Sequence, residues 1–75
     1  MKTKSHVEID FSPLVKALET SPISRQAMAD ACEVQYSTIW RLQRGLTVPT
    51  VAVLVSISQA LGVPTHTLYR VRERA

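Results

Sequence analysis

Apolar residues recur at helical spacing in two neighbouring segments near the middle of the chain. The first covers about residues 24–32 and the second about residues 36–44, and the pattern breaks between them at residues 33–35. Ser24 is suited to be the N-cap of the first segment, because its hydroxyl can accept a hydrogen bond from a backbone N–H one turn on. Gly45 can adopt the left-handed conformation that ends a helix. The pattern therefore predicts two short helices joined by a tight corner.

Further helices are predicted on both sides of this pair. Ser12 opens the preceding helix as its N-cap, Thr50 caps the following one, and Gly62 ends it. Pro64 begins the last element of the chain. The positions expected to face the core of these elements are Leu14, Ala17, Leu18, Val51, Leu54, Ile57, Leu61, Leu68 and Val71.

The first residues of the chain are mixed and polar. Residues 7–11 alternate between apolar and acidic side chains, which fits either a short strand or an ordered lead-in. Lys2, Lys4 and His6 form either a basic arm that reaches a phosphate or a frayed terminus.

The outward side of the helix predicted over residues 36–44 carries the most chemistry. With Ile39 and Leu42 setting the buried direction, the opposite side presents guanidiniums, aromatic rings, a hydroxyl and an amide, without a carboxylate. Arginine can bind guanine or phosphate, and an aromatic ring can contact a thymine methyl or a sugar. The side chains are those of Ser37, Trp40, Arg41 and Arg44, flanked by Tyr36 and Gln43. Such a face on a two-helix corner is typical of a DNA-reading helix-turn-helix.

The segment from Gly45 to Tyr69 contains no Asp, Glu, Lys or Arg. The helix within it is apolar on more than one side, and a domain this small cannot bury such a helix all round. We therefore expect a surface for self-association there, made by Val48, Ala52, Val53 and Val55.

The chain has 75 residues, of which 45% are hydrophobic, and a formal net charge of +3. This is the size of one small domain, in which oligomerisation often supplements a modest core. The composition is too apolar for a disordered chain, and the charge favours an anionic partner only slightly.

Several classes of protein do not fit the sequence. Cys32 is the single cysteine, at a core-facing position, and indicates a small buried side chain rather than a disulfide or metal ligand. The N-terminus lacks a signal-peptide core, and no apolar run approaches the roughly 20 residues of a membrane span. Paired carboxylates, an activated nucleophile and a glycine-rich phosphate loop are also missing. We expect a cytoplasmic protein that is not an enzyme and takes no metal, cofactor or small-molecule ligand.

The spacing of these features resembles that of the helix-turn-helix domains of phage repressors and Cro proteins. The resemblance runs without gaps from Ile23 to about Tyr69, over more than half of the chain. The matching positions are Ile23 to Ala29, Val34, Ser37 to Ile39, Arg41, Leu42, Gly45, Pro49, Thr50 and Gln59 to Val63.

Membership of this family implies a compact all-α fold of five helices, with residues 1–11 as a lead-in or arm and residues 12–75 as the DNA-binding domain. It also implies a homodimer that places the helix of residues 36–44 in the major groove of a near-palindromic operator. By position, Arg25 matches a residue that contacts phosphate and braces the reading helix, and Gln35 matches the cap of that helix. Tyr36, Ser37 and Arg41 match base readers, while Arg44 and Thr47 match phosphate contacts.

Three positions depart from the family pattern. Glu33 stands where a glycine is common at the corner, so the backbone there is expected to be strained or differently shaped. Tyr36 replaces a common polar base reader. Trp40 replaces a small residue, and either contacts the sugar-phosphate wall or packs on the protein itself.

The sequence features are consistent with two functions. The first is a dimeric, sequence-specific regulator of transcription that binds double-stranded DNA, with repression as the expected effect. The second is an antitoxin or another protein-interaction module that uses the uncharged surface of the helix after Thr50. The chain does not indicate the DNA sequence of the operator that the first function implies.

Overall fold

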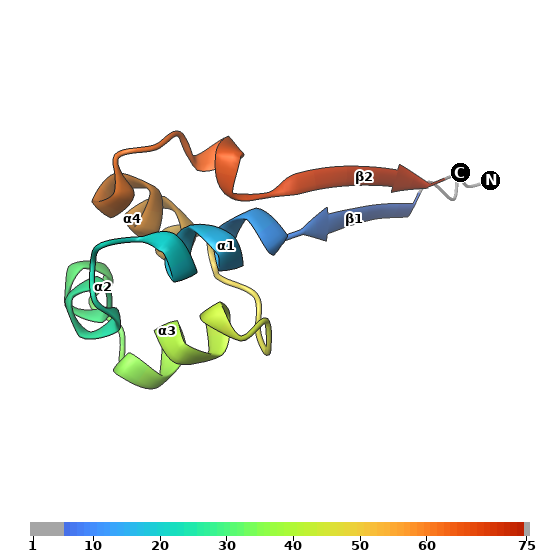
Figure 1. The fold of residues 1–75 in the computed structure, drawn as a ribbon. Coiled ribbons are helices and arrows are strands. Elements are labelled where there is room, and N and C mark those ends of the chain that lie inside the picture. Colours follow the sequence, from blue (N-terminus) through green and yellow to red (C-terminus); the bar gives the residue numbers. More distant parts are fainter. Residues whose placement is uncertain (1–5, 75) are drawn as a thin grey trace.

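The computed structural model describes residues 6–74 (Figure 1). Its helices are α1 (Ser12–Thr20), α2 (Arg25–Cys32), α3 (Tyr36–Gln43) and α4 (Val51–Leu61), followed by a short 3-10 turn, η1 (Thr65–Leu68). Two strands, β1 (His6–Asp10) and β2 (Arg70–Arg74), form an antiparallel pair. The strands lie at the two ends of the described chain, so their pairing brings these two ends together.

The predicted five-helix all-α fold is wrong. Instead of a fifth helix, the chain makes the single turn η1 after Pro64 and then becomes the extended strand β2. The helical interpretation required both Leu68 and Val71 to face the core, but Leu68 is buried and Val71 is exposed. Val71 alternates with arginines, and this period of two suits a strand whose backbone bonds to β1.

The strand alternative for residues 7–11 is confirmed, with β1 spanning His6–Asp10. The basic-arm hypothesis for Lys2 and Lys4 lies outside the described residues. Figure 1 shows the β1–β2 ribbon leaving the helical body as an extension, which is consistent with the long dimension of 47 Å against 21 and 19 Å in the other directions.

The core lies among the four helices and η1. Its most deeply buried side chains come from every one of these elements, and they are Leu14, Met28, Ile39, Leu42, Ile57 and Leu68. Cys32 is buried as expected, and this burial raises the pKa of its thiol. The core assignment of Val51 is wrong, because this first residue of α4 is 78% exposed.

Of the three N-caps predicted at Ser or Thr residues, two form in the structure. Ser24 Oγ accepts from the backbone N–H of Ala27 at 3.1 Å, and Thr50 Oγ1 accepts from that of Val53 at 3.2 Å. These bonds satisfy N–H groups that have no partner within the helix. The predicted cap at Ser12 is wrong, since Ser12 is itself the first residue of α1.

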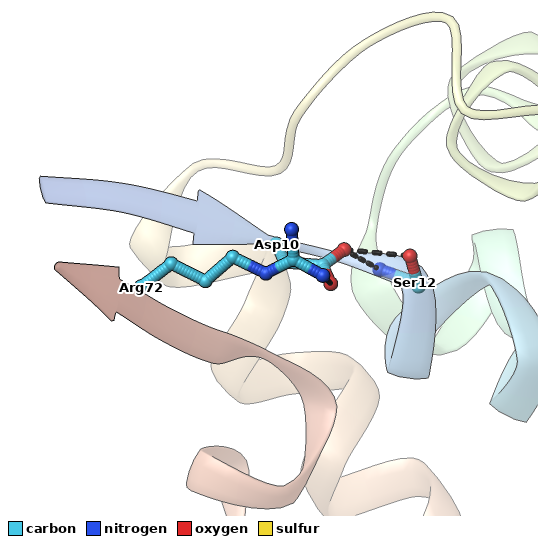
Figure 2. A network of polar contacts seen from close by, with 3 residues as sticks. All are labelled: Asp10, Ser12 and Arg72. Atoms are coloured by element: carbon cyan, nitrogen blue, oxygen red, sulfur yellow. Dashed lines mark hydrogen bonds and ion pairs between the residues drawn. The ribbon is translucent and has the colours of Figure 1, made fainter. Parts of the chain in front are cut away.

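Asp10 supplies the hydrogen bonds at the start of α1 instead. Its Oδ1 atom accepts from the backbone N–H of Ser12 at 2.9 Å and from the Ser12 hydroxyl at 2.6 Å. Its other oxygen, Oδ2, lies 3.3 Å from the guanidinium of Arg72 on β2 (Figure 2). The two hydrogen bonds from Ser12, aided by Arg72 and Arg70, lower the pKa of Asp10 below its ordinary 3.8. One carboxylate thus links β1, β2 and α1.

Candidate nucleic-acid interface

The corner between α2 and α3 is built on a residue in the left-handed conformation. Glu33 has φ 57° and ψ 43°, the conformation that glycine adopts most easily. The backbone N–H of Glu33 donates to the Asp30 carbonyl at 3.2 Å, and that of Val34 donates to the Ala29 carbonyl at 3.0 Å. This pair of bonds closes α2 as a Schellman motif. The expected strain at Glu33 is therefore present in the backbone.

Two buried residues fix the orientation of α3. Ile39 and Leu42 are almost fully buried, which turns the opposite side of the helix towards solvent. Arg41 and Arg44 are exposed, and Tyr36 is largely exposed. The face predicted from the helical pattern is thus an exposed face of the folded chain, and its two guanidiniums point away from the core.

Arg25 connects α2 to both ends of α3. Its Nε atom donates to Oε1 of Gln43 at 2.6 Å, and one terminal nitrogen donates to the hydroxyl of Tyr36 at 3.1 Å. Tyr36 and Gln43 are seven residues apart, so they lie on the same side of α3. A guanidinium has five N–H donors, and the two used here leave others free for an anion. Arg25 can therefore brace α3 and hold a phosphate at the same time.

The role of Gln43 was missed by the sequence analysis, which placed it only on the flank of α3. The spacing of Tyr36 and Gln43 was the available signal, since it aligns a hydroxyl and an amide along one side of the helix. The amide oxygen accepts a hydrogen bond from Arg25, and this bond fixes the orientation of the Gln43 side chain.

Trp40 and Arg44 interact one turn apart on α3. The guanidinium carbon of Arg44 lies 4.8 Å from the centre of the Trp40 ring, within the range of a cation–π contact. Trp40 is partly buried, so only part of its ring faces solvent. The contact holds the Arg44 side chain against the helix and lowers the entropy it loses on binding an anion.

The remaining predicted DNA-binding residues surround this face. Ser37 is partly buried in the first turn of α3, and Gln35 is exposed at the N-cap position, although its side chain makes no capping hydrogen bond. Thr47 is exposed in the loop after α3. Seven of the eight predicted residues thus lie on α3, at its caps, or at the start of α2, and Thr47 lies in the loop after α3.

A shallow hollow beside α3 brings one carboxylate near the arginines. It is lined by Val15 and Glu19 of α1 and by Arg25, Gln43 and Arg44. Glu19 therefore marks the edge of the region that an anionic ligand can occupy. Among residues 6–74, no group of three or more His, Cys, Asp and Glu residues is placed to hold a metal ion.

The predicted self-association surface on α4 is mostly open. Val48 and Ala52 are exposed, and Val55 lies at the border of exposure, whereas Val53 is partly buried against the core. Leu46 and Val51, which were not among the predicted residues, are exposed beside them.

Within the described chain, the helices are all too short or too polar to cross a lipid bilayer. No family model, curated protein or solved structure matches this chain. The exposed face of α3, oriented by its two buried residues and braced by Arg25, is therefore the observation from which a function can be inferred.

Proposed function

We propose that this protein is a sequence-specific regulator of transcription that binds double-stranded DNA through the exposed face of α3. The observation that carries the proposal is the exposure of Arg41 and Arg44 on a helix whose opposite side is buried through Ile39 and Leu42. Residues 36–44 contain no carboxylate, so nothing on this face repels a polyanion.

The proposed contacts divide into two kinds. Arg25 and Arg44, which line one hollow beside Gln43, bind phosphates, and this fixes the position of α3 on the duplex. Arg41 is exposed in the last turn of α3, and its guanidinium reads a base edge in the major groove. Tyr36 and Ser37, in the first turn of α3, complete the base-reading set. This division resembles that of phage repressor and Cro helix-turn-helix domains.

The proposed active form is a homodimer in the cytoplasm. A two-fold axis would place two copies of α3 about 34 Å apart, in successive major grooves of a near-palindromic operator. We assign regulation to occupancy of the DNA by this dimer, with repression as the expected effect.

The direct test is binding to labelled duplex DNA of random sequence, followed by fluorescence anisotropy over a series of salt concentrations. The double variant Arg41→Ala, Arg44→Ala should lose at least about tenfold in affinity, because it removes both exposed cations of α3. The matched control is Lys16→Ala, Arg70→Ala, which removes the same charge from α1 and β2. Equal loss in both double variants would show that net charge, and not the face of α3, determines binding.

A second candidate function is supported by the exposed apolar residues around the start of α4. Leu46, Val48 and Val51 are each more than three-fifths exposed, at 65%, 67% and 78%. Such a patch fits an antitoxin or another module that binds a partner protein. A partner that copurifies in a fixed ratio, and is lost from an Ala52→Lys variant, would favour this function.

A further inference from the structure

The β1–β2 ribbon has one charged face and one apolar face. In the antiparallel register, Glu8 pairs with Arg72 and Asp10 pairs with Arg70, so opposite charges stand across from each other on one side. Val7, Ile9 and Val71 lie on the other side, where Ile9 pairs with Val71. Glu73, opposite Val7 at the free end of the ribbon, is a charged position on this otherwise apolar side.

The apolar face continues the core of the domain. Just beyond the last register pair, Asp10 and Arg70, lie Phe11 and Tyr69, whose ring centres are 6.4 Å apart and which pack against the buried core. The burial ends at that point, because Val7, Ile9 and Val71 are 57%, 45% and 59% exposed. A strip of aliphatic side chains therefore runs from the core onto an extension that projects from the helical body (Figure 1).

A two-stranded ribbon of this length is marginally stable by itself in water, and it normally needs a helix or further strands over its apolar face. In this chain β1 and β2 contact mainly each other. The charged face is stabilised within the ribbon by the ion pair of Asp10 and Arg72 (Figure 2). The apolar face is therefore the side whose burial against a partner would stabilise the ribbon.

We propose that this face, formed by Val7, Ile9 and Val71, is the surface through which two copies of the chain associate, ribbon against ribbon. A second copy is the occupant that the charges favour. When two apolar faces pack together about a two-fold axis, the charged faces of both ribbons stay in water and keep their cross-strand partners.

Association through the strand edges is disfavoured by the same charges. Pairing β1 with β1 of a second copy brings Glu8 and Asp10 opposite carboxylates, and pairing β2 with β2 brings Arg70 and Arg72 opposite guanidiniums. Like charges directly across from each other destabilise a strand pair. Charged edge strands are also a common protection against open-ended assembly.

Three aliphatic side chains provide less than the roughly 800 Å² that each partner of a stable complex buries. The face continues, however, into a cleft lined by Ile9, Phe11 and Val48, between the start of α1 and the loop that follows α3. The exposed Leu46 lies in this loop. A partner ribbon that covers the face and reaches the cleft enlarges the interface. Of the predicted DNA-binding residues, Thr47 lines this cleft, whereas Arg25, Arg41 and Arg44 do not.

This inference rests on the homodimer of the proposed function, so its test is carried out without DNA. Sedimentation of the full chain over a series of micromolar concentrations should show a dimer, and Val71→Lys should make it monomeric. Gln59→Lys is the matched control, because it places the same charge on an exposed position of α4 outside the predicted self-association surface. A monomeric wild type, or a dimer that survives Val71→Lys, would overturn the proposal.

A more conservative variant tests the same interface in case Val71→Lys unfolds the ribbon. The double variant Val7→Thr, Val71→Thr keeps β-branched residues in both strands and should raise the dimer dissociation constant at least about tenfold. An unchanged constant would overturn the proposal. A wild-type monomer that still binds DNA would contradict only the proposed ribbon interface. A ribbon dimer without affinity for DNA would contradict only the proposed function.

Discussion

Arg25, at the start of α2, donates a hydrogen bond of 2.6 Å to the side chain of Gln43, at the end of α3. The same guanidinium also bonds to Tyr36 at the other end of α3, at 3.1 Å. The helix that carries the candidate DNA-binding face is therefore held at both ends by one side chain from the preceding helix.

The variant Arg25→Ala should weaken DNA binding about equally on preferred and random sequences. Arg25 braces α3, and in the proposed function it contacts phosphate, which carries no sequence information. The slope of log affinity against log salt should also fall by about 1. Gln26→Ala, a neighbouring exposed change on α2, is the control and should bind as the wild type does. A loss confined to the preferred sequence would assign Arg25 to base reading instead.

The variant Arg41→Ala should lose about 1–3 kcal/mol of binding to the preferred sequence and relax the preference at one base position. Arg41 is exposed in the last turn of α3, and a guanidinium can form two hydrogen bonds to a guanine. Binding to all single-base variants of the preferred site measures both effects. Arg70→Ala removes the same charge from β2 and serves as control. An equal loss on every site would exclude Arg41 from base readout.

The variant Glu33→Gly should raise the free energy of unfolding by about 1 kcal/mol. Glu33 holds φ at 57°, a conformation that costs a residue with a side chain about 1–2 kcal/mol. Glycine removes this cost, but its greater flexibility in the unfolded chain offsets part of the gain in stability. Urea unfolding followed by circular dichroism gives the difference. Glu19→Gly, in helical conformation within α1, should be destabilising. A loss of stability in Glu33→Gly would mean that the Glu33 side chain contributes more than the strain costs.

Asp10 should make the stability of the ribbon depend on pH in the acid range. Hydrogen bonds from Ser12 lower the pKa of Asp10 below 3.8, so its contribution is complete well above pH 3.8 and is lost as the pH falls through the lowered pKa. The thermal midpoints of wild type and Asp10→Asn should therefore differ at neutral pH and converge in acid. Ser12→Ala removes the largest cause and should bring the pKa of Asp10, followed by NMR, closer to 3.8. Midpoints that stay equally far apart in acid would contradict the linkage.

The sequence predicted the four α-helices because their boundaries are encoded by nearby residues. Ser24 and Thr50 make the expected capping bonds, and Gly62 ends α4 with φ 71°. Each of these signals acts within a few residues, so it can be recognised without knowledge of the rest of the fold. The exposed face of α3 followed in the same way from Ile39 and Leu42.

The ribbon could not be predicted with the same success, because it depends on contacts between the two ends of the chain. The spacing of Leu68 and Val71 fits a helix, and the alternation around Val71 fits a strand, so the local pattern was ambiguous. The strand is formed because β1 is available as a partner, with Ile9 across from Val71. The bond between Arg25 and Gln43 was missed for a related reason, since their contact follows from the angle at the corner of Glu33.

The most direct test of the account is selection of the full chain's binding sites from a pool of random duplex DNA. The proposed function predicts an enriched near-palindromic motif with half-sites one helical turn apart, and loss of enrichment in the Arg41→Ala, Arg44→Ala variant. A pool that stays random after repeated rounds, while the protein remains folded, would contradict the central claim that the exposed face of α3 reads DNA.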